Sequence, residues 1–327
     1  MRGASSRQTN RVSLRHVAAT AASGGGLEKT SDILTVDVVD RVLARVTGPG
    51  LDWRGSRFAA YRDELVAHRT AARDFVEAFR RDEGRQRLLF ETGGQLLQLV
   101  LASAVWDHLD QRLLNQNLEI VLAGPALDPT DDDRPRNTLL ELVAAANLAD
   151  RFQVSLTANA EDVRLDHPVL GQGAVECKRP KRVDNILGNL NKISSQLRAR
   201  ERAGSRFGVA VVGADRIAAL ASQAHEAPTI DVADGSMDDL AKIVFKRVLR
   251  DAWDVACDLL PSAYFATVIV TGSILVREPL HLRPVCQVLD FHLPRMLVPD
   301  DVRVRSTAER MVRCLASLYA VRNSTAR

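Results

Sequence analysis

The sequence predicts an α/β protein, with a mixed central sheet flanked by helices and a helical region before it. Three observations support this class. From residue 137, helical and strand periodicities follow in the order helix, three strands, helix, strand, helix, strand. Residues 207–212 are apolar without polar alternation, as in a strand covered on both faces. The composition of the 327 residues, 46% hydrophobic and 26% charged, is that of an ordinary globular protein.

Composition also excludes several classes of protein. The net charge is only +3, so any contact with nucleic acid must come from a local basic patch. The four cysteines form no Cys-x-x-Cys pair, which argues against a zinc site or a disulfide framework and favours a reducing compartment. We find no uninterrupted apolar run of about 18–20 residues, the length that spans a membrane. We therefore expect a cytoplasmic protein without a membrane partner.

The N-terminal part divides into a tail and a helical region. Residues 1–30 form a flexible, weakly basic tail, although their arginine-rich start is also similar to an organelle transit peptide. Residues 31–130 form the helical region, with an amphipathic segment over 31–48 and helices over 56–82 and 85–117. Residues 124–136 are a loop by composition. Its Asp131-Asp132-Asp133 run is interpreted as solvated in preference to a metal cluster.

The α/β region is predicted over residues 131–327. Asn137 is expected to cap a helix that continues to about residue 150. The following elements are strands over 152–156, 162–165 and 174–178, a helix over 184–202, a strand over 207–212, a helix over 237–260, strands over 264–270 and 283–292, and a helix over 306–321. The stretch 264–272 either extends the core sheet or belongs to a dimer surface.

Residues 173–180 contain an acidic and a basic side chain two positions apart near the end of a predicted strand. Strand side chains alternate between faces, so Glu176 and Lys178 share one face while Val175 and Cys177 point into the interior. Such a triplet occurs by chance about once or twice in a chain of this length, so its meaning depends on its surroundings. A structural interpretation also exists, because a Glu–Lys pair on a strand is usually a modest ion pair.

The surroundings resemble the PD-(D/E)XK superfamily of restriction-endonuclease-like nucleases. The segments that carry this resemblance are residues 137–141, 161–164 and 175–180, and it covers roughly 137–213. Glu161 stands where the family often has proline. The resemblance implies a restriction-endonuclease-like fold and a Mg²⁺-dependent nuclease, with Mn²⁺ as a substitute ion. Its catalytic residues would be Glu141, Asp162, Glu176 and Lys178.

The resemblance also implies the role of each residue. Asp162, Glu176, Glu141 and the Cys177 backbone carbonyl would bind the ion, and Lys178 would hold the attacking water or stabilise developing charge. Asp166 competes with Asp162 for the first position, but its neighbours suggest that it has left the strand. Structural alternatives remain for Glu141 as an exposed helix residue and for Asp162 as a turn residue.

A local basic run favours a phosphate-rich substrate. Residues 176–206 carry nine basic and three acidic side chains, a local charge of +6. The expected nucleic-acid contacts are Arg179, Lys181, Arg182, Lys192 and Gln196. Gln196 also resembles the polar residue that some members of the family place beside the metal site, although it could equally be a surface residue. DNA is favoured over RNA. A non-catalytic nucleic-acid-binding or assembly protein on the same fold is the alternative, and a homodimer or a separate partner protein is compatible with either.

Overall fold

The computed structural model describes most of the chain between residues 35 and 292. The described residues are 35–48, 50–70, 82–126, 134–149, 152–157, 163–168, 171–220, 226–228, 231–233, 236, 239, 243, 263–276 and 281–292. Several predictions lie outside them: the tail, the Asp131–Asp133 run, Asp162, most of the helix over 237–260 and the helix over 306–321.

The helical N-terminal region is confirmed where it is described. Its helices are α2 (Val36–Thr47), α3 (Arg57–Thr70), α5 (Glu83–Ala102) and α6 (Gln111–Leu122), with a 3₁₀ segment at Ser103–His108. The expected single helix over 85–117 is wrong. Asp110 ends that continuity because its carboxylate accepts a hydrogen bond from the Leu113 N–H and starts α6 as a new helix.

The next helix, α7 (Arg134–Leu148), starts four residues earlier than a helix capped by Asn137 would. Asn137 therefore lies within the first turn and is not the N-cap. Pro135 is compatible with this earlier start, because the first-turn N–H groups of a helix have no partner within it.

The central sheet is mixed and has seven strands among the described residues. Three antiparallel strands come first: β1 (Gln153–Leu156), β2 (Val163–His167) and β3 (Gly171–Lys178). Helix α8 (Ile186–Arg202) then crosses over to β4 (Phe207–Gly213), which is parallel to β3. The path through the sheet is β1-β2-β3-β4-β6-β5, with β7 paired to β6. The predicted α/β class is therefore confirmed.

The long strand β6 (Ala263–Val276) continues the core sheet, which decides between the two interpretations of this segment. It pairs in parallel with β4 and, farther along, with β5 (Glu226–Ala227). β7 (His281–His292) returns antiparallel to β6 over the whole length of β7. A short helix, α9 (Asp215–Leu220), follows β4 directly.

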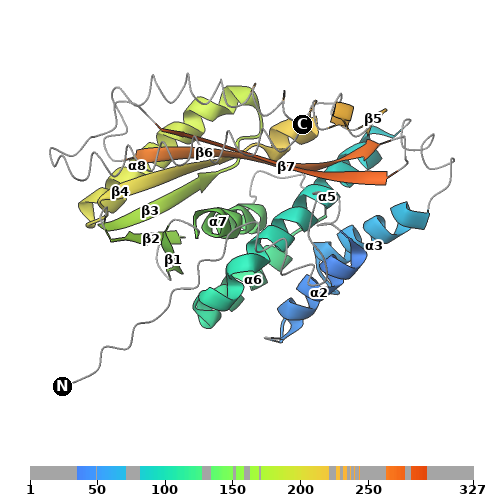
Figure 1. Cartoon of the computed structure of the whole chain (residues 1–327), viewed down its shortest axis with the longest axis horizontal. Coiled ribbons are helices and arrows are strands. Elements are labelled where there is room, and N and C mark those ends of the chain that lie inside the picture. The colour runs from blue at the N-terminus through green and yellow to red at the C-terminus, as the bar shows by residue number, and fades with distance from the viewer. Residues whose placement is uncertain are drawn as a thin grey trace.

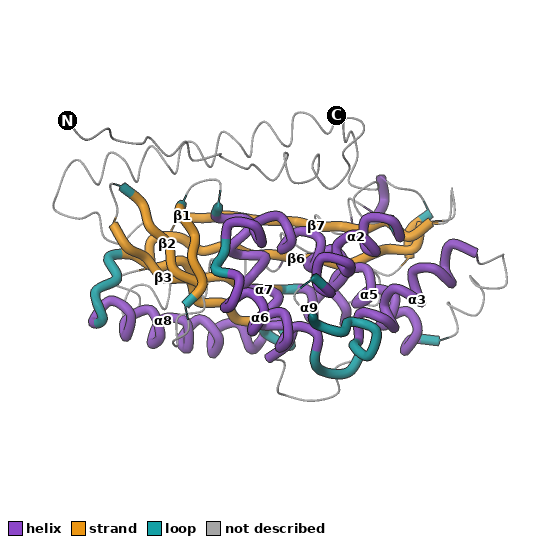
Figure 2. Tube along the Cα trace, turned by 90° about the horizontal axis from the view of Figure 1, so that it is seen from below, coloured by secondary structure: helices purple, strands orange, loops and turns teal. Residues whose placement is uncertain are grey.

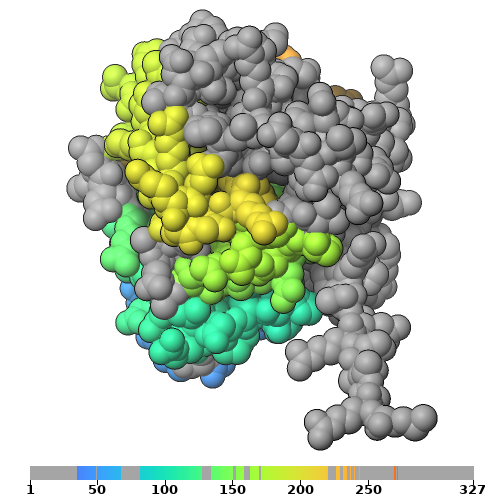
Figure 3. All heavy atoms as spheres, turned by 90° about the vertical axis from the view of Figure 1, so that its left-hand side faces the viewer, coloured from blue at the N-terminus to red at the C-terminus, as the bar shows by residue number. Residues whose placement is uncertain are grey.

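Helices cover both faces of the sheet, as Figures 1 and 2 show, with α8 on one side and α5–α7 on the other. Two glycines of β4 mark these faces: a Cβ on Gly208 would meet Leu197 of α8, whereas one on Gly213 would meet Leu140 of α7. In the end-on view of Figure 3, the green segment of β1–β3 lies between the teal helical layer and the yellow segment that leads from the end of α8 into β4.

One hydrophobic core joins the N-terminal helices to the sheet. It includes Val39 of α2, Leu99 of α5, Leu139 of α7, Val175 of β3 and Val211 of β4, all almost fully buried. The helical region and the described α/β region therefore share this core across residue 130.

Helix α5 lies at the centre of this core. By length and composition the segment Glu83–His108 could cross a membrane, with a mean hydropathy of 1.4, but 78% of its most apolar window is buried inside the protein. Polar residues such as Glu91 and Gln95 interrupt the segment, so it is not a continuous apolar run.

Candidate functional site

The Glu176 and Lys178 side chains lie on the same face of β3, as predicted. The Lys178 Nζ atom is 3.9 Å from Glu176 Oε2. Val175 and Cys177 belong to the core on the other face and are 1% and 3% exposed, which confirms Cys177 as a buried packing residue. The Lys178 side chain is partly exposed at the end of the strand, whereas Glu176 is completely buried.

Glu176 has a second cationic neighbour that the sequence did not indicate. The Nε of Arg200, in the last turn of α8, lies 3.3 Å from Glu176 Oε1 and donates a hydrogen bond to it. The two residues are far apart in the sequence, and only the crossover of α8 over β3 brings them together. Because removing a carboxylate from water is costly, these two cations help to make the burial of Glu176 tolerable.

The Cys177 carbonyl, an expected metal ligand, accepts a hydrogen bond of 3.0 Å from the Lys178 Nζ. The lysine ammonium is thus held between this carbonyl and the Glu176 carboxylate. A divalent ion at the carbonyl would have to share it with the ammonium. Lys178 is therefore positioned beside the carboxylate by its own strand.

Of the two candidates for the first carboxylate, only Asp166 belongs to the described residues. Asp166 lies within β2, opposite Gln172 of β3, so the expectation that it had left the strand is wrong. That position is four residues from Glu176, or about 13 Å along an extended strand. The described β2–β3 ladder begins at Val163 opposite Val175. Asp162 precedes Val163 in the sequence and lies outside the described residues, so the preference for Asp162 over Asp166 stays a prediction.

The remaining candidates come from the two covering helices. Glu141 is half-buried on α7, the helix that packs on the opposite face of the sheet from α8. Gln196 lies one turn before Arg200 on α8, and its Oε1 is buried with no hydrogen-bond partner among the described residues. Within the described part of the chain, no group of three or more His, Cys, Asp or Glu side chains is arranged to hold a metal.

Arg179 does not lie on the surface, contrary to its expected role as a nucleic-acid contact. Its Nε lies 3.1 Å from Asp215 Oδ1, its Nη2 bonds Asp215 Oδ2, and its side chain is only 3% exposed. The pair joins the end of β3 to the start of α9. The other expected contacts are more accessible: Arg182 and Lys192 are exposed and Lys181 is half-buried.

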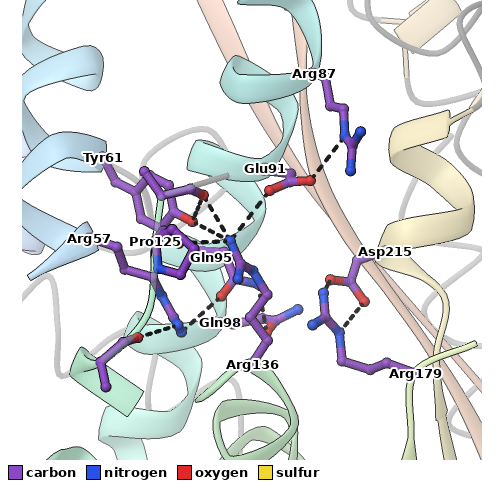
Figure 4. Close-up of polar contacts among 12 residues, drawn as sticks. Arg57, Tyr61, Arg87, Glu91, Gln95, Gln98, Pro125, Arg136, Arg179 and Asp215 are labelled. Carbon is purple, nitrogen blue, oxygen red and sulfur yellow. Dashed lines mark hydrogen bonds and ion pairs between the residues drawn. The ribbon is translucent and has the colours of Figure 1, made fainter. Parts of the chain in front are cut away.

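A buried polar cluster lies beside the Arg179–Asp215 pair (Figure 4). Glu91 of α5 is 3.3 Å from Arg87 and 3.6 Å from Arg136 of α7. Burial raises the pKa of the Glu91 carboxyl, and the neighbouring arginines oppose that rise. The ion pair and Glu91 line a small cavity, with room for about one water molecule, together with Phe90, Gly94, Gln95, Arg216 and Thr271.

The sequence indicated a helix in this region but not this cluster, because leucines dominate α5. Glu91, Gln95 and Gln98 recur at positions i, i+4 and i+7 among those leucines. Gln98 donates a hydrogen bond of 2.6 Å to the Thr271 hydroxyl of β6, which ties α5 to the sheet. A polar row at helical spacing within an apolar helix was the available signal.

Comparisons with protein families, with curated proteins and with solved structures found no match for this chain.

Proposed function

We propose that this protein is a restriction-endonuclease-like, Mg²⁺-dependent nuclease that hydrolyses phosphodiester bonds, with DNA favoured over RNA. One observation carries the proposal. Glu176 and Lys178 are side by side at the end of β3, in a sheet built in the order α7-β1-β2-β3-α8-β4. The family resemblance rests on this element order, which is rarer by chance than the Glu-x-Lys triplet alone.

The sheet supports the proposal in two further ways. β1, β2 and β3 are antiparallel neighbours, and β4 returns parallel to β3 through α8, so the mixed order of the sequence prediction is retained. Glu176 and Lys178 lie near the carboxyl end of β3, and open α/β sheets generally bind their ligands at the carboxyl ends of their strands.

The available donors suit a hard cation. Glu176 offers carboxylate oxygens, Cys177 a backbone carbonyl and Gln196 a buried amide oxygen that lacks a described partner. Asp162 would add the second carboxylate, whereas Glu141 is a weaker candidate because α7 packs on the opposite face. When bound, Mg²⁺ would lower the pKa of a coordinated water and offset negative charge on the phosphate.

The chain's own residues would do the remaining work. Lys178 would orient the water or stabilise charge from beside Glu176, since its ammonium is already held at the Cys177 carbonyl. The accessible cations Lys181, Arg182 and Lys192 would attract the phosphate backbone and make binding dependent on salt. Arg179 would act through Asp215, by fixing the end of β3.

The test is cleavage of plasmid, single-stranded DNA and RNA in Mg²⁺, Mn²⁺ or EDTA. Glu176→Ala and Lys178→Ala should each lower the cleavage rate by about 100-fold or more, because each removes a group at the reacting phosphate. Asp184→Ala, which removes an exposed carboxylate soon after the triplet, is the matched control and should cleave normally. Cleavage that persists in both site variants would refute the assignment.

A second candidate is a nucleic-acid-binding or assembly protein that uses the same fold without catalysis. The observation that favours it is the complete burial of Glu176 between two cations, as in a structural ion pair. Salt-dependent binding to the same nucleic acids, with no cleavage in either metal, would favour this candidate.

A further inference from the structure

We propose that Arg200 is the resident counter-ion of the Glu176 carboxylate, that a divalent cation displaces it, and that it thereby sets the metal affinity of the site. This inference rests on the proposed function, because it concerns the same carboxylate. It adds a residue that the family resemblance does not assign and a competition that can be measured without any cleavage assay.

The argument begins with the burial of Glu176. The side chain is 0% exposed, so an ionised carboxylate there needs positive charge close by. Each of its oxygens faces a different cation: Oε1 is 3.3 Å from the Arg200 Nε, and Oε2 is 3.9 Å from the Lys178 Nζ. Arg200 and Lys178 together supply the charge that a bound metal would otherwise supply.

Of the two cations, Arg200 is the one that can leave. Lys178 is two residues from Glu176 on the same strand, and the Cys177 carbonyl also holds its ammonium. Arg200 comes from another element, and its long side chain begins in the last turn of α8, where the helix dipole favours a cation. The guanidinium can therefore withdraw while its backbone stays in place.

The geometry of the contact points the same way. Two nitrogens of Arg179 donate hydrogen bonds to the two carboxylate oxygens of Asp215, and the Arg179 side chain is 3% exposed. Arg200 meets Glu176 through Nε alone, and its side chain is 15% exposed. A bidentate pair is stronger than a single charged hydrogen bond. The Arg200 contact is thus the one suited to exchange.

Gln196 supplies an oxygen next to the exchanging group. It precedes Arg200 by four residues, so both side chains leave the same face of α8. Its Oε1 is buried and has no hydrogen-bond partner among the described residues. A divalent cation that replaced the guanidinium at Glu176 would find this oxygen on the side that faces β3.

The test measures Mn²⁺ binding to the full chain by electron paramagnetic resonance of the free ion. Removing the competing charge in Arg200→Gln should tighten the apparent Kd for Mn²⁺ by about tenfold or more. Arg202→Gln, which removes an exposed charge from the same turn of α8, should leave the Kd unchanged. Glu176→Gln should abolish this binding.

Metal-dependent melting provides a second measurement. Arg200→Gln should melt below the wild type without metal, and Mn²⁺ should raise its Tm more than it raises that of the wild type. Arg200→Lys keeps a charge but loses the Nε–H that reaches Oε1, so we expect an intermediate Kd. This variant provides the comparison if Arg200→Gln does not fold.

The two proposals fail in different ways. In the first case, Glu176→Gln abolishes Mn²⁺ binding, but Arg200→Gln and Arg200→Lys bind Mn²⁺ no more tightly than the wild type. That result would overturn the role of Arg200 and leave the metal site supported. Binding that is unaffected by Glu176→Gln, or absent from every variant, would overturn the metal site itself and the role of Arg200 with it.

Discussion

The pKa of the Glu91 carboxyl depends on burial and on the charged side chains around it. Its carboxylate is 12% exposed, and four charged residues influence it: Arg87 on its own helix, Arg136 on α7, Arg179 after β3 and Asp215 on α9. Desolvation is the largest effect and raises the pKa of the Glu91 carboxyl, and Asp215 adds to it, while the three arginines lower it.

The stability of the protein should therefore carry a pH-dependent contribution from Glu91. The folded protein binds the Glu91 proton more tightly than the unfolded chain does. The stabilisation that results is complete below the ordinary pKa of about 4.5 and is lost as the pH rises through the folded value. Compared with Glu91→Gln, the wild type should lose free energy of unfolding as the pH rises above about 4.5, measured by urea denaturation at several pH values.

The control for this prediction is Glu119→Gln, which changes an exposed carboxylate on α6. The prediction would be contradicted if the free energy of unfolding of the wild type, minus that of Glu91→Gln, grew with pH. That result would show that the arginines lower the pKa of Glu91 more than burial raises it.

Four neighbouring residues at the end of β3 have four different environments. Glu176 is buried against Arg200, Cys177 packs in the core, Lys178 reaches the edge of the strand, and Arg179 is buried on Asp215. The alternation of the strand predicts the first three directions. It does not predict that Arg179 is buried, because that depends on where α9 begins.

At the scale of elements, the pairing of β3 with β4 depends on small residues at close contacts. Gly173 stands opposite Phe207 of β4, and a Cβ at position 173 would approach the Phe207 ring to 2.4 Å. That ring also stacks on Phe152, with centroids 5.5 Å apart. The ring is therefore confined on both sides, and Gly173 has a packing role.

Gly173→Ala should lower the free energy of unfolding by about 1–3 kcal/mol, because the methyl group overpacks against the ring. Urea denaturation would measure this loss, and adding Phe207→Leu should recover part of it. The matched control is Gly188→Ala on α8, where a Cβ meets nothing within 4 Å. That substitution should stabilise the protein by about 0.5–1 kcal/mol, since alanine favours a helix. A neutral Gly173→Ala would contradict the close packing.

At the scale of the whole molecule, the continuous core makes the helical region a structural part of the sheet's covering layer. Leu139 and Leu140 of α7 are fully buried in the same cluster as residues of α2, α3 and α5. The Gln98–Thr271 hydrogen bond and the Glu91–Arg136 ion pair add polar links from α5 to β6 and α7.

A fragment of residues 134–327 should therefore not fold cooperatively on its own. Removing α2 to α6 exposes the apolar face of α7 and of the sheet, so the fragment should bind a hydrophobic dye and lack a sharp melting transition. Calorimetry and dye fluorescence would measure both properties. Deleting only residues 1–30, the predicted tail, should leave the Tm unchanged. Cooperative melting of the fragment near the wild-type Tm would show two separable domains.

The sequence by itself determined the elements whose signal is local. The apolar run over 207–212 indicated a buried strand, the alternation around Glu176 indicated its shared face with Lys178, and helical spacing indicated α2, α5 and α8. These predictions needed only neighbours in the chain, because strand and helix periods fix the direction of each side chain.

Only the tertiary structure decided what each side chain meets. Arg200 reaches Glu176 because α8 crosses over β3, Arg179 finds Asp215 because β4 ends beside β3, and Glu91 is buried because α5 lies against α7. Each of these contacts joins segments far apart in the sequence, and their charges alone are equally compatible with solvated surface residues. Packing, and not composition, decides which of these charged side chains are buried. Burial makes Glu176 an ion-paired carboxylate and lets Arg179 fix the end of β3.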